Sequence, residues 1–158
     1  MKLKTVARFA MVAVIAGFVL GPAVVTNAAE DPANVIKFRQ MLMKSIGAHM
    51  GSIAAVAKGE VDQGMDHIVK HAEAIALVAV LIPDAFEKNV GSTAAETNAK
   101  DTIWSDWTDF RAKAQALPSA AAKLAQAAGS GDKQAMFAAL KETGGACGAC
   151  HKANRIKN

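Results

Sequence analysis

Apolar residues recur at intervals of three and four along most of the chain after residue 31, which is the spacing of one face of an α-helix. Four such stripes can be traced: Val35, Phe38, Leu42, Ile46, Met50, Ile53 and Ala57; Met65, Ile68, Ala72, Ile75, Ala79 and Ile82; Ile103, Trp107, Phe110, Ala114, Leu117, Ala121, Leu124 and Ala128; Met136, Leu140, Thr143, Cys147, Cys150 and Asn154. Near-heptad steps and short first and third connections predict an all-α fold, an antiparallel four-helix bundle.

Start and stop signals bound these stripes. Asp31 and Pro32 form an N-cap followed by a proline at the first helical position, and Gly59 is a typical helix stop. We expect Pro83 to end the second helix. The segment from Pro83 to Asp101 is long for a connection, and we expect it to wrap the bundle.

The first 28 residues have the pattern of a secretory signal peptide. Three cationic residues precede the apolar stretch 9–20, and small residues follow it. Because that stretch is short for a membrane span, cleavage after Ala28 or Ala29 is favoured over a retained anchor. We therefore expect one mature domain, 29–158, located in the periplasm and free of the membrane.

Removing the signal peptide changes the charge balance. The full chain has 18 Lys and Arg against 14 Asp and Glu, a net charge of +4. The first 28 residues hold three of the cations and no acid, so the mature domain has 15 cations against 14 acids and a net charge of +1. A near-neutral domain does not indicate a nucleic-acid partner.

The two cysteines lie in one short motif near the end of the chain. Residues 147–151 read Cys-Gly-Ala-Cys-His, the attachment pattern of c-type haem. On a helix, Cys147, Cys150 and His151 share one face, so each thiol can form a thioether to a haem vinyl group while the imidazole meets the iron. We predict one covalent haem c inside the bundle.

Three glycines accompany the motif. Gly144, Gly145 and Gly148 each weaken a helix by roughly 1 kcal/mol relative to alanine. A flat macrocycle lying against the helix is a reason to tolerate them, because missing side chains allow its plane to approach the backbone.

Other uses of the two thiols remain open at this point. Export places them in an oxidising compartment, where a disulfide between Cys147 and Cys150 is possible. A thioredoxin-type redox pair is typical of a βαβ context, which the pattern lacks. A zinc site needs one more ligand beyond the two cysteines and His151.

The motif and three other stretches resemble the cytochrome c′ family, the class II cytochromes c. "KFRQMLMKSIGAHMGSI" is similar to the family's first helix, "GST…TIWSDWTDF" to its loop and third helix, and "CGACHKANR" matches C-x-x-C-H-x-x-x-R. The resemblance spans the mature chain. One departure is visible: the residue before the final arginine is often aromatic in the family, and here it is Asn154.

The residue on the other side of the iron distinguishes an electron carrier from a gas binder. In an antiparallel bundle, Met43 and His151 lie about 7 Å apart along the axis at 1.5 Å per residue, whereas His49 and Met50 lie more than about 15 Å from His151. Met43 is also the position that the family uses, so the chain resembles the methionine-ligated, low-spin branch. The alternative is that Met43 only fills the core.

The resemblance implies further roles at the haem. It places Arg39 against a haem propionate, Gln40 at the haem edge and Arg155 near the proximal imidazole of His151. The alternative for Arg39 is a solvated surface residue. The alternative for Arg155 is a cation that stabilises the C-terminal end of its helix through the helix dipole.

Two pairs of residues outside the motif have less specific interpretations. His67 and His71 are four residues apart and have the spacing of a surface metal site, but solvated histidines are the favoured interpretation. Trp104 and Trp107 are expected in the core.

Together these patterns predict a periplasmic monohaem cytochrome that passes single electrons between redox partner proteins. It would be an electron carrier and not an enzyme, with low-spin iron ligated by His151 and Met43, and a homodimer is possible. The alternative is a high-spin cytochrome c′ that binds NO or CO at a vacant distal site. A weak haem peroxidase is disfavoured, because no acid–base residue is placed level with the iron.

Overall fold

The computed structural model describes residues 30–91 and 93–157, which form helices and no strands. The helices are α1 (Pro32–Ala57), α2 (Met65–Ala79), α3 (Ile82–Phe86), α4 (Thr102–Ser105), α5 (Trp107–Gly129) and α6 (Lys133–Asn154). The four long ones confirm the predicted all-α bundle. None of the described helices combines the length and the hydropathy needed to cross a bilayer. The expected signal peptide, 1–28, lies outside the described residues.

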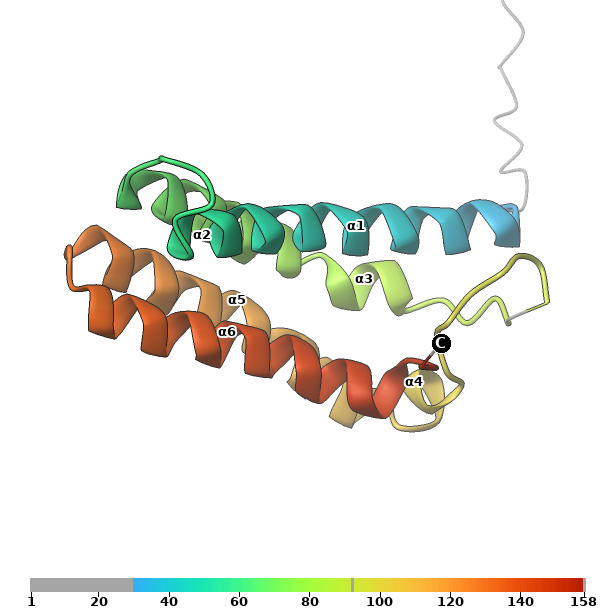
Figure 1. Ribbon diagram of the computed structural model, residues 1–158. Coiled ribbons are helices and arrows are strands. Elements are labelled where there is room, and N and C mark those ends of the chain that lie inside the picture. The colour runs from blue at the N-terminus through green and yellow to red at the C-terminus, as the bar shows by residue number, and fades with distance from the viewer. Residues whose placement is uncertain (1–29, 92, 158) are drawn as a thin grey trace, which may run out of the picture.

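The long helices pack in sequence order, α1 on α2, α2 on α5 and α5 on α6. Figure 1 shows α1 and α6 running in opposite directions, with the start of α1 and the end of α6 at the same end of the molecule. The short helices α3 and α4 and the loop between them lie at that end too. Within the described residues, α1 and α6 do not pack closely on each other.

The seam between α2 and α5 forms the centre of the core. Small residues such as Ala72 and Ala121 are fully buried and allow the two helices to approach closely. Ile68, Ile75 and Leu124 fill the remaining space and are at most 1% exposed. Burying each of these large side chains contributes about 1.5–3 kcal/mol.

Side-chain caps start two of the long helices where the sequence predicts. The Asp31 carboxylate accepts a hydrogen bond from the Ala33 N–H at 3.0 Å, and that of Asp132 accepts one from the Gln134 N–H at 2.8 Å. Gly59 follows α1 with a φ of 74°, a conformation that glycine adopts without strain. These local signals explain why both ends of α1 were predictable.

Two helix boundaries differ from the prediction. α2 ends at Ala79, and Pro83 instead lies in the first turn of α3, where its missing N–H costs nothing. The third apolar stripe is divided at Asp106, whose backbone leaves the helical region before its carboxylate caps α5 through the Asp109 N–H. A bend at this point separates α4 from α5 and lets α4 lie against the end of α6.

Candidate functional site

The last turns of α6 carry the three residues of the attachment motif. Cys147 and Cys150 are half-buried and pack against the main apolar core, whereas His151 is exposed. No disulfide joins the two cysteines. Two thiols one turn apart on the inner side of a helix, followed by an imidazole, are the donor set that a c-type haem requires.

The surroundings of the thiols disfavour the other uses of the motif. Burial raises the pKa of Cys147 and of Cys150, whereas reactive redox cysteines have lowered pKa values. Within residues 30–91 and 93–157, no group of three or more His, Cys, Asp or Glu side chains is placed to hold a metal ion. A haem therefore fits these residues better than a redox pair or a zinc site.

The pKa of the imidazole next to the thiols is lowered, which favours its neutral form. Desolvation is the larger cause that lowers the pKa of His151, and the positive charge of Arg155 is the second. A neutral imidazole has a free nitrogen lone pair, which is the form that binds a metal.

The protein's own packing does not explain the three glycines of α6. A Cβ atom added at Gly144, Gly145 or Gly148 would meet no protein atom within 4 Å. Alanine would therefore fit at each position and would favour the helix by roughly 1 kcal/mol. The space beside the helix is consistent with the close approach of a flat group that is not part of the chain.

On α1, Met43 and Met50 both pack against the main apolar core, and only Met43 is at the level that the sequence predicts for an iron ligand. Met43 is half-buried and packs against the same apolar core as Cys147 and Cys150, while Met41 is 52% exposed. The antiparallel arrangement of α1 and α6 agrees with the level at which the sequence placed Met43. Its ligation of iron stays a prediction.

Arg39, one turn before Met43, is buried and only 4% exposed. Its Nε donates to the Ala85 carbonyl at 2.8 Å and its Nη2 to the Lys88 carbonyl, and the guanidinium lies 5.1 Å from the ring centre of Phe86. Burial lowers the pKa of Arg39 from its ordinary value. The alternative of a solvated surface arginine is therefore wrong. The predicted propionate contact is untested, and N–H groups outside these two bonds remain for it.

The other two residues implied by the resemblance lie at the same end of the bundle. The Gln40 amide donates to the Glu96 carbonyl at 2.8 Å, which ties α1 to the loop before α4. Arg155 follows α6, and its N–H donates to the His151 carbonyl at 3.0 Å. Gln40 at the haem edge stays a prediction, as does a direct role of Arg155 beside the proximal ligand.

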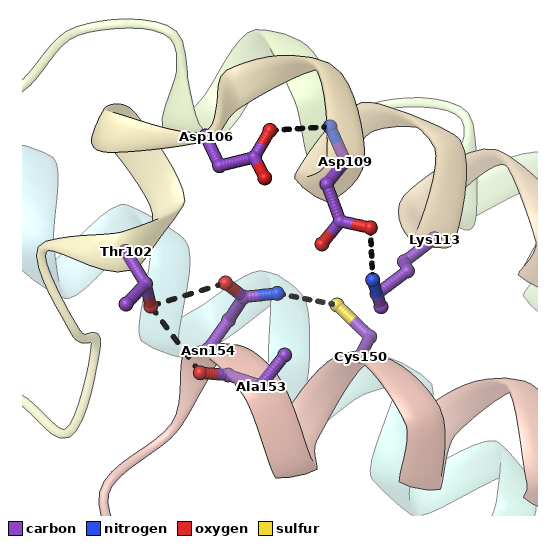
Figure 2. Close-up of polar contacts among 7 residues, drawn as sticks. All are labelled: Thr102, Asp106, Asp109, Lys113, Cys150, Ala153 and Asn154. Carbon is purple, nitrogen blue, oxygen red and sulfur yellow. Dashed lines mark hydrogen bonds and ion pairs between the residues drawn. The ribbon is translucent and has the colours of Figure 1, made fainter.

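Sequence reasoning missed the contacts of Asn154, which is 6% exposed. Figure 2 shows its side chain between Cys150 and Thr102. Its amide Nδ2 donates to the Cys150 sulfur at 3.9 Å, and its Oδ1 accepts from the Thr102 hydroxyl at 3.3 Å. The only signal in the sequence was that an amide replaces the aromatic residue common in the family.

Histidines pair across α1 and α2, farther from the attachment motif. Nδ1 of His49 and Nδ1 of His71 are 2.8 Å apart and share a hydrogen bond. The pKa of His71 is lowered, first by burial and then by His49 and His67. His71 is therefore partly buried and hydrogen-bonded, and a bond between two rings requires that at least one be neutral.

Comparison with known proteins identifies what the chain is similar to. A family model described as Cytochrome C' matches residues 34–155. The chain is 37% identical over 125 residues to a cytochrome c' of Pararhodospirillum photometricum, covering 79% of this chain and 98% of that protein. It is 42% identical over 119 residues to a cytochrome c-556 of Agrobacterium tumefaciens, and the match covers 75% of this chain and 92% of that protein.

Solved structures have the same architecture. A cytochrome c' from Rubrivivax gelatinosus matches with a TM-score of 0.70 and 31% identity, covering 80% of this chain and 98% of that one. A nitric oxide complex of a variant of cytochrome c prime from Alcaligenes xylosoxidans matches with a TM-score of 0.69 and 30% identity, covering 83% and 100%.

These findings correct the predicted function. Electron transfer through low-spin iron, held permanently by His151 and Met43, was expected. Relatives that align with this chain over nearly their whole length are instead described as cytochrome c'. A second solved variant from Alcaligenes xylosoxidans is ferrous with bound NO. The gas-binding alternative is better supported. The error has a physical reason, because a methionine at the right level of a helix does not establish that its sulfur occupies the iron.

Proposed function

The chain belongs to the cytochrome c′ family, and we propose that it binds nitric oxide or carbon monoxide at the distal side of its haem. Its cofactor is a covalently bound haem c. The haem supplies the iron to which the gas binds. The residues of the chain hold the haem, orient it and shape the side from which the gas approaches.

We assign the attachment to α6. Cys147 and Cys150 would each hold the haem through a thioether, formed by addition of the S–H across one vinyl group. His151 is the proximal ligand, and the neighbouring Arg155 disfavours a second positive charge on its imidazole. These roles are supported by the half-buried thiols and the lowered pKa of the imidazole.

We assign the distal side to the first half of α1. Met43 presents an apolar, polarisable side chain to the incoming gas, so it sets access to the iron rather than filling the position permanently. Arg39 lies one turn away with its guanidinium held by two carbonyls, and we propose that a remaining N–H pairs with a propionate. Gln40 supports the same edge from the loop side.

The observation that carries the proposal is that Met43 and both thiols pack against one apolar core from helices that do not pack closely on each other. A flat group between α1 and α6 would meet the thiols on one side and an apolar side chain on the other. The apolar Met43 side chain favours a neutral diatomic gas over peroxide chemistry, which needs an acid–base residue beside the iron. The nitric oxide complexes of relatives support the same function.

Absorption spectra of the purified holoprotein test this function. We expect a high-spin ferric spectrum and a complete spectral change when CO or NO is added to the ferrous protein. Met43→Ala should speed the binding of CO, because it removes a side chain that the gas must pass. Met41→Ala, an exposed position on the same helix, is the matched control and should leave the rate unchanged. A ferrous protein whose spectrum does not respond to either gas would contradict the proposal.

We further propose a periplasmic location and a homodimer. The pattern of residues 1–28 supports export. Phe38 and Met41, about half exposed and three residues apart on α1, support self-association. Fractionation of cells tests the first point. Sedimentation of wild type and of Phe38→Lys tests the second, and a monomer at all concentrations in both would contradict it.

A further inference from the structure

We propose that Asn154 is a positioning residue for the haem: its amide links the Cys150 sulfur to Thr102, the first residue of α4, and donates a hydrogen bond to that sulfur. The proposal rests on the proposed function in one respect, that Cys150 carries a thioether. It assigns a purpose to a position where this chain has an amide and its family often has an aromatic ring.

The side chain of Asn154 is placed by contacts at both of its ends. It lies one helical turn after Cys150, and its Nδ2 donates to the sulfur at 3.9 Å, a long hydrogen bond even for an acceptor as large as sulfur. Its Oδ1 accepts from the Thr102 hydroxyl at 3.3 Å, and the same hydroxyl donates to the Ala153 carbonyl at 3.2 Å. Figure 2 shows this chain of contacts from Thr102, the first residue of α4, to the Cys150 sulfur.

The backbone around Asn154 is fixed as well. Its carbonyl accepts from the Lys100 N–H at 2.9 Å, and the Ile156 N–H donates to the Asn98 carbonyl at 2.8 Å, in an antiparallel bridge between Ala99 and Arg155. A side chain on such a tethered backbone cannot swing away from the sulfur easily. The described part of the chain has no buried side-chain nitrogen or oxygen without a hydrogen-bond partner, so both ends of this amide are satisfied.

The hydrogen bond to sulfur is compatible with covalent attachment. A thiol loses its proton when it becomes a thioether, but the sulfur keeps lone pairs that accept a hydrogen bond. An N–H donor is therefore useful both before and after attachment, whereas an acceptor for the S–H would lose its partner. A donor at a haem substituent draws electron density from the macrocycle and favours the ferrous state, as outer hydrogen bonds do at other metal centres.

The ion pair of Asp109 and Lys113 lies on the same side of Cys150, which makes this side of the sulfur polar. The amide is the only member of these contacts that donates to the sulfur itself. Its removal should therefore change the haem electronically as well as loosen the end of α6.

Three variants of the holoprotein test the proposal. Asn154→Leu removes both amide contacts at similar volume. Thr102→Val removes the hydroxyl that orients the amide and leaves the N–H donor in place. Thr143→Val is the matched control, because its buried hydroxyl bonds the Ala120 and Ala139 carbonyls on the same side of α6 without touching a sulfur. Each protein is measured for thermal midpoint, reduction midpoint potential, and haem attachment at Cys147 and Cys150 by mass spectrometry of peptides.

We expect Asn154→Leu to lower the midpoint potential and to raise the fraction of chains attached through Cys147 alone. Thr102→Val should shift the potential less and in the same direction. Thr143→Val should lower the thermal midpoint without moving the potential. The proposal is overturned if Asn154→Leu and Thr102→Val lose stability but keep the wild-type potential and full attachment. If Asn154→Leu yields no holoprotein, an unshifted potential in Thr102→Val overturns it alone. A wild type with no haem on Cys150 would instead overturn the assigned attachment site.

Discussion

The α2–α5 seam and the end of the bundle that carries the attachment motif are buried in different ways. The seam is filled by apolar side chains such as Ile75 and Leu124. At the other end, Arg39 and Asn154 are buried, and each is held by hydrogen bonds to distant parts of the chain. Apolar packing tolerates many solutions of equal volume, whereas hydrogen bonds specify directions and distances. The comparison indicates that the seam supplies stability and the polar end supplies the geometry of the site.

Removing the proximal imidazole should produce the largest functional change. In His151→Ala the helices remain, because the side chain is exposed and supports no core contact. We expect loss of the wild-type haem spectrum and of its response to CO, with unchanged helical circular dichroism. His67→Ala, on α2, is the control and should keep both; an unchanged spectrum in His151→Ala would contradict the assigned ligand.

A cavity in the α2–α5 seam should lower the stability of the protein and leave its haem site unchanged. Leu124→Ala, at a fully buried position, should lower the free energy of unfolding by about 2–5 kcal/mol. The midpoint potential and the CO-bound spectrum should stay at wild-type values. Denaturant titration of the holoprotein measures the first quantity. A shifted potential would show that the seam and the site are not independent.

Arg39→Leu should affect stability and site together, since the guanidinium is buried at the polar end and donates hydrogen bonds there to two carbonyls. The carbonyls of Ala85 and Lys88 lose their donors, at a cost of about 1–3 kcal/mol for a buried group left unsatisfied. If the guanidinium also pairs with a propionate, the midpoint potential shifts as well. Arg39→Lys keeps the charge but not the two-carbonyl geometry, so recovery of the potential without recovery of stability would separate the two roles.

The smallest effect should come from the histidine pair between α1 and α2. Because the pKa of His71 is lowered below 6.5 in the folded state, the unfolded chain binds a proton first as the pH falls. Stability should therefore decrease as the pH drops from 6.5 towards the folded pKa. His71→Gln removes this dependence, and denaturant titrations on both sides of that pH compare it with wild type. Equal pH slopes in the two proteins would contradict the assignment.

The helices of the bundle were predictable because their signals are local. The three- and four-residue spacing of Leu42, Ile46 and Ile53 defines a buried face, and Asp31 and Asp132 cap their own helices. Pro83 shows the limit of such signals. A proline is compatible with the end of one helix or the first turn of the next, and the choice of α3 depended on packing against α1 and α5.

The attachment motif could likewise be recognised from the sequence, since one turn of helix brings Cys147, Cys150 and His151 together. The function was not, because the presence of Met43 does not decide whether the iron keeps a free position. Relatives described as cytochrome c' and crystallised with NO corrected that prediction.

By itself the sequence determined the helical bundle and the covalent haem, and it predicted the residues of α6 that attach the haem, because each depends on neighbours within a few positions. Only the tertiary structure decided where the polar side chains point. The Arg39 guanidinium meets a carbonyl 46 residues away, and Asn154 meets a hydroxyl 52 residues away. Such pairs form only after the chain has closed the loops between them, so no local sequence pattern predicts them.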